Sequence, residues 1–372
     1  MANVEFCAPC LFGIEGILGD ELRRMGAENV RPENGRVLFA GDMELLARVN
    51  IGSRYAERIQ IHLGSFPARS FEELFQGVKA LPWEAWIGQK NAFPVKGWAL
   101  NSALHSVPDC QSIIKKAVVD RLSQTYGLRW FEETGPVCQI QFTILKDEAT
   151  LLLDTSGAGL HKRGYRANAG GAPIKETLAA AIGDVMRVRR AAQVCDLCCG
   201  SGTMLIEAAL AAKGIAPGVR RRFAAMDWGS VPGSIWKEER QRARERERPD
   251  AVFQAHGGDI DEACLRLTEE NAAKAGVAGC VTAKRADLRQ FQPEGDTGVV
   301  LCNPPYGERL LDVKAAEELY RVMGRVFRPK PGWSYGIISP HENFETLFGR
   351  QADKRRKLYN GMLKCQLYMY FK

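Results

Sequence analysis

The hydrophobic and polar positions of the chain follow one pattern of predicted strands and helices before about residue 160 and a different pattern after it. Before it, segments of alternating polarity and segments of helical periodicity follow one another without strict alternation, which is typical of α+β layers. The expected helices cover 15–25, 43–50, 71–79 and 112–126, and the expected strands cover 35–40, 55–63, 98–106, 138–145 and 150–154. The last two strands predict a hairpin around Lys146-Asp147.

After Gly164, apolar strands alternate with helices, and this alternation predicts parallel strands in a doubly wound sheet. The expected strands cover 193–197, 251–257, 280–284, 298–302 and 334–338, and the expected helices cover 204–213, 262–275 and 314–327. Two apolar runs around Asn360-Gly361 predict a C-terminal antiparallel hairpin over 357–371. A segment rich in Gly, Pro, Trp and Arg, about 214–250, is expected as an insertion between the first two strands. We therefore predict a domain boundary near 155–170.

Length and composition narrow the class of protein. A chain of 372 residues favours two or three domains, and 45% hydrophobic with 26% charged residues is typical of globular proteins. No apolar run approaches the roughly 20 residues that span a bilayer, and the N-terminus lacks the features of a signal peptide. The net charge, 51 − 44 = +7, permits a polyanionic partner without requiring one.

The cysteines point to a reducing compartment. Eleven cysteines, an odd number, stand in a chain too long to need disulfides, so we expect free thiols and a cytoplasmic protein. Two CxxC pairs, Cys7/Cys10 and Cys195/Cys198, suggest a shared zinc site as one hypothesis. Buried thiols are the better interpretation, because the second pair leads directly into a glycine turn after an apolar strand. No metal is expected.

One segment, 237–248 (KEERQRARERER), is almost wholly charged with alternating signs. Such a pattern usually indicates a solvated helix with ion pairs between residues four apart. An arm that touches phosphates is the functional alternative.

A glycine turn joins the first strand of the second half to its helix, in Asp196-Leu-Cys-Cys-Gly-Ser-Gly-Thr203. Glycines there allow the backbone to approach a ligand closely, and the helix N-terminus offers unpaired N–H groups. A nicotinamide site requires a third glycine and an acid about 20 residues further on, and both are absent. The ligand that suits this turn is S-adenosylmethionine, which carries no phosphate.

Three aspartates stand where S-adenosylmethionine needs acceptors. Asp196 can bond its ammonium, Asp259 at the end of the second strand its ribose, and Asp287 at the end of the third strand its adenine amino group. One such aspartate is commonplace, but three in register with a glycine turn favour a cofactor site.

The segment 303–309 follows the fourth strand and begins Asn303-Pro304-Pro305-Tyr306. The two prolines stiffen the turn and remove two N–H donors. The Asn303 side-chain oxygen and the Pro304 carbonyl can accept both protons of a planar amine, which directs the nitrogen lone pair at a methyl donor. Tyr306 can stack on the base that carries the amine. The alternative is a surface turn without chemistry.

These motifs resemble class I amino-methyltransferases, and the segments 160–166 and 172–179 resemble the lead-in helix of THUMP-domain RNA guanine-N2 methyltransferases, the RlmL-like group. The resemblance implies a ferredoxin-like subdomain (1–55), a THUMP RNA-binding domain (56–158) and a Rossmann-like methyltransferase domain (159–372). It implies methylation of guanine N2 in RNA, with 23S ribosomal RNA favoured. Leu197 and Cys198 depart from the family's usual proline and phenylalanine.

Site residues follow from the resemblance position by position. The catalytic set is Asn303, Pro304, Pro305 and Tyr306, and the cofactor set is Asp196, Cys199, Gly200, Ser201, Gly202, Thr203, Asp259, Ile260, Asp287 and Glu176. For Glu176, a solvent-facing helix carboxylate is an equal alternative. Basic candidates for the RNA backbone, offered as a group, are Lys115, Lys116, Lys162, Arg163, Arg166 and 220–222.

Three other functions remain open. The same chemistry on transfer RNA uses the same modules. A DNA adenine-N6 methyltransferase shares the Asn-Pro-Pro-Tyr turn, although the N-terminal half resembles an RNA module. A non-catalytic RNA-binding protein with a vestigial methyltransferase fold is disfavoured, because a site without activity has no need of all these residues.

Overall fold

The first 67 residues of the chain contain a ferredoxin-like unit. The computed structural model describes residues 3–166, 174–188, 193–306 and 313–371. The unit runs β1 (Val4–Pro9), α1 (Glu15–Arg24), β2 (Glu28–Glu33), β3 (Arg36–Gly41), α2 (Met43–Gly52) and β4 (Gln60–Pro67). Its strands lie in the order β2-β3-β1-β4, with β1 antiparallel to both β3 and β4. Asp42 caps α2 through a hydrogen bond from the Leu45 N–H.

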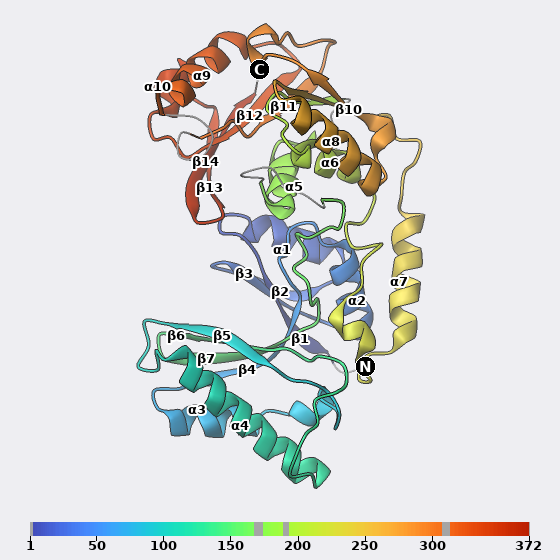
Figure 1. The fold of residues 1–372 in the computed structure, drawn as a ribbon, viewed down its shortest axis with the longest axis vertical. Helices are drawn as coiled ribbons and strands as arrows, with labels where there is room; N and C mark the ends of the chain where they lie inside the picture. The colour runs from blue at the N-terminus through green and yellow to red at the C-terminus, as the bar shows by residue number, and fades with distance from the viewer. Residues whose placement is uncertain (1–2, 167–173, 189–192, 307–312, 372) are drawn as a thin grey trace.

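The next elements extend the same sheet. They are α3 (Phe71–Ala80), β5 (Val95–Leu100), α4 (Val107–Tyr126), β6 (Ile140–Leu145) and β7 (Glu148–Asp154). The strands add in the order β4-β7-β6-β5, so one seven-stranded sheet runs through both units and β4 belongs to each. Helices α3 and α4 lie together on the outer side of this part of the sheet (Figure 1).

The second half of the chain forms a separate seven-stranded sheet. Its strands are β8 (Gln193–Asp196), β9 (Gln254–Asp259), β10 (Val281–Arg285), β11 (Gly298–Cys302), β12 (Trp333–Ser339), β13 (Lys354–Asn360) and β14 (Leu363–Phe371). The order is β10-β9-β8-β11-β12-β14-β13, parallel from β10 to β12 and antiparallel at β14. The expected doubly wound sheet with a C-terminal hairpin is confirmed.

Helices cover both faces of this sheet. They are α5 (Glu176–Val185), α6 (Thr203–Ala212), α8 (Glu262–Ala275), α9 (Val313–Val326) and α10 (Phe344–Phe348). Because side chains alternate along a strand, β11 serves two cores. Val299 and Leu301 pack in the core that contains α5 and α6, whereas Val300 and Cys302 pack in the core that contains α9.

The insertion between β8 and β9 binds the two halves together. Its helix α7 (Gly233–Glu245) runs alongside the ferredoxin-like unit and packs on α2 (Figure 1). The buried Glu239 carboxylate accepts two hydrogen bonds from Arg48 of α2, at 3.1 and 2.8 Å. In the part of the insertion that precedes α7, the Trp228 indole N–H donates to the carbonyl of Val137, which lies just before β6 (3.0 Å). The charged segment is thus a helix, as expected, but one side of it is docked rather than solvated.

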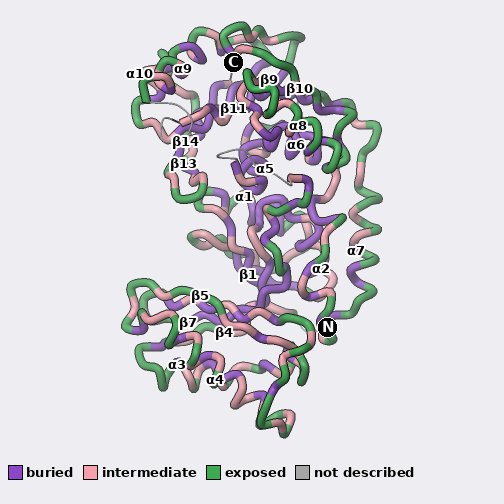
Figure 2. The backbone as a smooth tube through the Cα atoms, viewed as in Figure 1, coloured by how far each residue is buried: buried purple, intermediate pink, exposed green. Residues whose placement is uncertain are grey.

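The main core does not stop at the domain boundary. One cluster of buried side chains reaches from Phe6 to Met369, and Figure 2 shows buried backbone continuing from the ferredoxin-like sheet into α5 and α6. Arg54 donates to the carbonyls of Leu210 (3.2 Å) and Ile215 (2.7 Å) across this junction. No helix among the residues described is long and apolar enough to cross a bilayer.

Several expected elements were wrong at their ends; β9, for example, begins at Gln254 and not at 251. The strand expected over 55–63 begins only at Gln60, because Tyr55, Ala56 and Ile59 are buried in a loop rather than paired in a sheet. The strand expected over 98–106 is β5, which ends at Leu100. Helix α4 begins at Val107 instead of 112, since Ser106 precedes it and a proline occupies its first turn.

Candidate functional site

The predicted site residues meet at one edge of the second sheet. Strands β10, β9, β8 and β11 are neighbours and parallel, so the residues that follow their carboxyl ends lie along the same edge. Asp196 ends β8, Asp259 ends β9, Asp287 follows β10, and Asn303 follows β11. The sheet order therefore brings all four together, which spacing along the sequence alone could not establish.

The glycine turn is held by residues of α8 that the sequence analysis did not identify. Gly202 has φ +77°, and a Cβ there would lie 2.7 Å from the Thr268 side chain. Thr268 donates to the Gly200 carbonyl (2.9 Å), and the Asn271 amide donates to the Ser201 carbonyl (3.0 Å). By contrast, a Cβ at Gly200 would meet no atom within 4 Å. The turn is thus fixed on the side that faces α8, whereas the space next to the Cα of Gly200 is open.

Asp196 is a buried acid at the head of this turn. Its side chain accepts one hydrogen bond, from the Cys198 N–H (3.1 Å), and the residue is 2% exposed. Burial, with a smaller contribution from Asp259, raises its pKa to about 7. A carboxyl group with so little compensation suits a cationic ligand group, because a nearby positive charge restores its preference for the ionised form.

Asp259 organises the loop as well as facing the site. Its carboxylate accepts one hydrogen bond from the Gly200 N–H (3.0 Å) and another from the Asp261 N–H (3.0 Å). Each oxygen keeps a second lone pair, so the carboxylate can still accept hydroxyl donors. Sequence reasoning gave this residue only a ligand role.

Asp287 and Ile260 occupy the outer part of the edge. Asp287 accepts from the Arg289 N–H (2.9 Å) and pairs with its guanidinium (3.0 Å). These contacts, led by the backbone hydrogen bond, lower the pKa of Asp287. Ile260 is 70% exposed at the end of β9, which leaves an apolar side chain free to cover a flat ring.

Other members of the expected cofactor set have internal contacts. The Cys199 N–H donates to the Gly258 carbonyl (3.1 Å), and its thiol accepts from Thr268. The Ser201 and Thr203 hydroxyls lie 3.3 Å apart at the start of α6. The side chains of these three residues therefore make contacts inside the protein.

Glu176 begins α5 and is 2% exposed, so the solvent-facing alternative is wrong. Its carboxylate pairs with Arg166 (3.0 Å), and Arg166 also approaches the Thr203 hydroxyl (3.4 Å). Burial raises the pKa of Glu176. The structure therefore connects Glu176 to the glycine turn through Arg166. The first residues of the expected lead-in helix, 172 and 173, lie outside the described residues.

The Asn-Pro-Pro-Tyr turn lies directly after β11. Pro304 is buried, and the Tyr306 hydroxyl donates to the Asn303 side-chain oxygen. Burial raises the pKa of Tyr306, so this hydroxyl keeps its proton. Beside the turn is a cleft of about 520 Å³ between α9 and the β13–β14 hairpin, lined among others by Tyr306, Tyr320 and His341. The rest of the expected loop, 307–309, lies outside the described residues.

Two of the basic residues expected on RNA are internal. Arg163 is buried, and its guanidinium donates to the carbonyls of Leu160 (2.8 Å) and Arg54 (2.5 Å). Arg166 is committed to Glu176. We therefore correct both assignments, because the Arg163 side chain is buried and the Arg166 guanidinium is half-buried in an ion pair with Glu176.

The remaining basic candidates differ in exposure. Lys115 pairs with Glu133 (2.5 Å) and lies over the Phe93 ring, which leaves little of it for RNA. Lys116 and Lys162 are exposed. In 220–222, Arg221 donates to two carbonyls of 158–160, and its pKa is lowered to about 10 by burial, whereas Arg220 and Arg222 are exposed.

The cysteines are free throughout, and most are buried. Burial raises the pKa of Cys7, and of Cys195, to about 12. Among the residues that the structure describes, no group of three or more His, Cys, Asp or Glu side chains could hold a metal ion.

Comparison with known proteins gives the same order of units. Family models match an RlmL ferredoxin-like domain at 5–60, a THUMP domain at 68–154, and an RMKL-like methyltransferase domain at 163–369. YpsC of Bacillus subtilis (strain 168), named provisionally as an RNA methyltransferase, is 41% identical over 100% of this chain and 97% of its own length. The chain belongs to the RlmKL-like family of RNA methyltransferases.

Other members of the RlmKL-like family extend the comparison. The ribosomal RNA large subunit methyltransferase K/L of Cellvibrio japonicus (strain Ueda107) is 33% identical over 98% of this chain, which spans only 51% of that relative. The crystal structure of SMU.472, described provisionally as a methyltransferase and complexed with SAH, has a TM-score of 0.94 at 41% identity and covers 100% of this chain and 98% of its own.

A structure from Listeria monocytogenes str. 4b F2365 has a TM-score of 0.93 at 43% identity, covering 100% of this chain and 97% of its own. It is described provisionally as an N6-adenine-specific DNA methylase, but the THUMP match and the RNA methyltransferase relatives place this chain among enzymes that act on RNA.

Membership of the RlmKL-like family confirms the expected fold class and S-adenosylmethionine as cofactor. The open space above Gly200 and the buried Asp196 carboxyl fit that cofactor.

Proposed function

We propose that the chain transfers a methyl group from S-adenosylmethionine to the exocyclic N2 of a guanine in RNA, with 23S ribosomal RNA as substrate. The observation that carries this proposal is the position of the Asn303 turn beside the glycine turn. Strands β11 and β8 are paired neighbours, so Asn303 and Asp196 leave adjacent strands at the same edge. The name of the K/L relative supports the ribosomal substrate.

The chemistry needs an amine whose lone pair is freed from conjugation. The Asn303 side-chain oxygen and the Pro304 carbonyl would accept the two amine protons, and the stiff proline pair would hold these acceptors in place. The Tyr306 hydroxyl, by donating to the Asn303 oxygen, would fix the orientation of that amide. The cofactor supplies an electrophilic methyl group on a sulfonium.

The cofactor contacts follow from the order of the strands. Asp196 would bind the ammonium, Asp259 the ribose hydroxyls and Asp287 the adenine amino group, with Ile260 against the adenine ring. Gly200 and Gly202 would allow the backbone to approach the methionine portion. The remaining members of this set support the turn or, for Glu176, act through Arg166: Cys199, Ser201, Thr203 and Glu176.

We assign RNA capture to the N-terminal half and methyl transfer to the C-terminal half. The proposed units are ferredoxin-like 1–55, THUMP 56–158 and methyltransferase 159–372, with β4 shared between the first two. Lys116 and Lys162 remain as exposed contacts for the RNA backbone.

The test is a map of methylated guanines in ribosomal and transfer RNA from cells that lack this protein. We expect one N2-methylguanine of 23S ribosomal RNA to be lost, restored by the parental gene and not by an Asn303→Ala gene. Loss of a transfer RNA methylguanine instead would move the substrate to transfer RNA. An unchanged pattern in both RNAs would overturn the proposal.

A further inference from the structure

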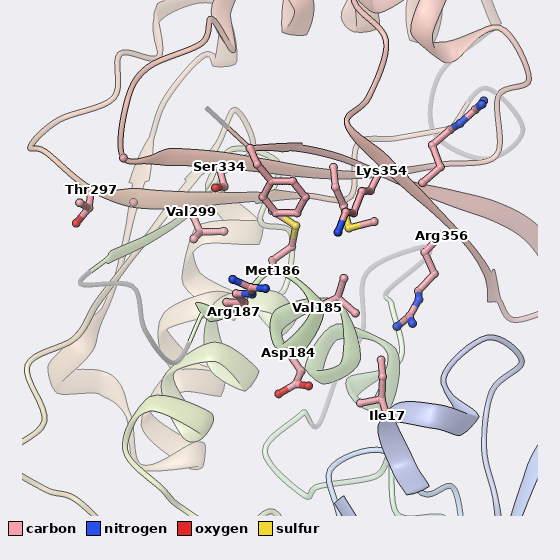
Figure 3. Close-up of a pocket in the computed structure, with 15 residues that line it drawn as sticks. Ile17, Asp184, Val185, Met186, Arg187, Thr297, Val299, Ser334, Lys354 and Arg356 are labelled. Atoms are coloured by element: carbon pink, nitrogen blue, oxygen red, sulfur yellow. The ribbon is translucent and has the colours of Figure 1, made fainter. Parts of the chain in front are cut away.

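A large cleft lies on the opposite edge of the second sheet from the Asn303 turn. Its volume is about 1010 Å³, and it lies between the sheet and α5, next to α1 (Figure 3). The sheet side includes Thr297, Gly298 and Val299 at the start of β11. Since Asn303 follows the other end of that five-residue strand, the cleft and the turn lie roughly 16 Å apart along the strand direction.

Basic side chains dominate the polar rim of this cleft. Lys354 and Arg356 are two residues apart on β13, so their side chains leave the same face of the strand. In Figure 3 both point away from the strand into the space above α5 and α1. Arg187, at the end of α5, borders the same space and is exposed.

Within the part of the chain that the structure describes, the side chains of Arg187, Lys354 and Arg356 make no hydrogen bond or ion pair with another residue. Their neighbour Arg355 contrasts with them, because its guanidinium pairs with Glu345 (3.2 Å). The one acidic residue in the described lining is Asp184. The described lining therefore contains four cationic side chains, of which Arg355 is paired with Glu345, and one acid, and this excess of positive charge would be neutralised by an anionic ligand.

The walls behind these charges are apolar. Val185 at the end of α5 and Met186 directly after it line one side, and Val299 of β11 with Met369 and Phe371 of β14 lines the sheet side. Ile17 of the ferredoxin-like unit closes the lower end. An apolar floor with an uncompensated cationic rim suits a nucleotide, which presents a flat base and an anionic phosphate.

We propose that this cleft binds a single-stranded segment of the substrate RNA, with Lys354, Arg356 and Arg187 on its phosphates. The proposal rests on RNA as the substrate class of the family. It adds a contact outside the THUMP domain and remote from the reacting amine. Because the cleft lies between the ferredoxin-like unit and the methyltransferase sheet, RNA held there touches both halves of the chain.

The test compares RNA binding by the parental protein and by the Lys354→Gln/Arg356→Gln double variant, using a fluorescein-labelled single-stranded RNA oligonucleotide over a range of salt concentrations. Each phosphate contact on a single strand adds about 0.7 to the slope of log affinity against log salt, so the double variant should lose about 1.4. At physiological salt this corresponds to about tenfold weaker binding. Arg187→Gln alone should lose about half of that slope.

The matched control is Lys357→Gln/Arg266→Gln, which removes the same charge from the opposite face of β13 and from α8. The control should bind RNA nearly as the parent does. Affinity for S-adenosylhomocysteine should be unchanged in all variants. With methylatable RNA, KM should rise in the cleft variant while kcat is retained, because the Asn303 turn is untouched.

Parental affinity and salt slope in the double variant would overturn the proposal. Equal losses in the cleft and control variants would also overturn it, since binding would then depend on net charge alone. A second experiment measures the binding of inorganic phosphate and adenosine monophosphate to the same proteins. If the double variant loses affinity for these ligands but binds RNA as the parent does, the cleft is a site for a free nucleotide and not for RNA. The binding assay does not depend on which nucleotide is methylated, so it can fail or succeed independently of the proposed guanine chemistry.

Discussion

The Arg163 guanidinium lies 3.5 Å from the Glu207 carboxylate, and both side chains are almost fully buried. The pair joins the segment that leads into the methyltransferase domain to α6, and the Tyr165 hydroxyl donates to the same carboxylate (3.0 Å). Charge buried to this degree is part of the junction between the two halves and not of an RNA-binding surface.

Replacing Arg163 therefore tests stability. Arg163→Met would leave the Glu207 carboxylate buried without its counter-charge, which typically costs about 3–5 kcal/mol. We expect the midpoint of urea unfolding to fall sharply, while RNA affinity of the folded protein and its salt slope stay parental. The double variant Arg163→Met/Glu207→Gln should recover much of the loss. A stable single variant with weakened RNA binding would return Arg163 to the RNA surface.

The Asn303 turn offers a graded test of amine activation. Asn303→Ala removes one of the two acceptors, and we expect kcat to fall by about 10²–10³-fold with cofactor affinity near parental. Tyr306→Phe keeps the ring and loses the hydroxyl that donates to Asn303, a hydrogen bond worth about 1 kcal/mol, so kcat should fall by roughly fivefold. Single-turnover methylation and calorimetry with S-adenosylhomocysteine separate the two steps. Unchanged turnover in Asn303→Ala would remove it from the chemistry.

The second half of the fold was largely predictable because its rhythm is local. Strand β11 over 298–302 and helix α8 over 262–275 fall where the periodicity placed them. Strand β11 is an uninterrupted apolar run that ends before Asn303-Pro304, and α8 lies between an Asp261 cap and Gly276. The first half was harder. Strands β1 and β2 were not predicted, and the exposed, charged β2 carries almost no apolar alternation.

Contacts between distant segments could not be predicted from the sequence. The carboxylates of Asp196, Asp259 and Asp287 could be grouped from the sequence only because a doubly wound sheet places the carboxyl ends of its parallel strands at one edge, and their role as ligands stays a prediction. Nothing local distinguishes Arg163, which is buried, from Lys162, which is exposed. Likewise Thr268, whose side chain lies against Gly202, belongs to helix α8, and the sequence of that helix contains no motif that indicates a binding role.

Asp259 accepts a hydrogen bond from the glycine turn and is the residue that we propose for the cofactor ribose, so its loss should affect both the turn and cofactor binding. We expect Asp259→Ala to weaken S-adenosylhomocysteine binding by about 10- to 150-fold, from charge-assisted hydrogen bonds worth about 1.5–3 kcal/mol. Glu262→Gln, which removes an exposed charge three residues away, is the matched control and should bind normally. Calorimetry measures both, and equal affinity in all three proteins would exclude Asp259 from the ribose site.

The pKa of Asp196, raised to about 7 by burial, makes cofactor binding depend on pH. Below pH 7 the carboxyl carries a proton that must leave before an ammonium can pair with it. Affinity for S-adenosylhomocysteine should therefore fall about tenfold for each pH unit below 7 and level off above 7.

In the absence of ligand, the stability that Asp196 contributes to the folded protein changes with pH in the opposite direction to that of an ordinary paired aspartate. The pKa in the folded protein exceeds the ordinary aspartate value of 3.8, so the stability contributed by this group is full below pH 3.8 and declines as the pH rises toward 7. Asp196→Asn should abolish the pH dependence of both binding and stability near neutrality, and calorimetry on either side of pH 7 measures the first. A parental affinity that stays constant across that range would show that this carboxyl is already ionised or does not meet the ammonium.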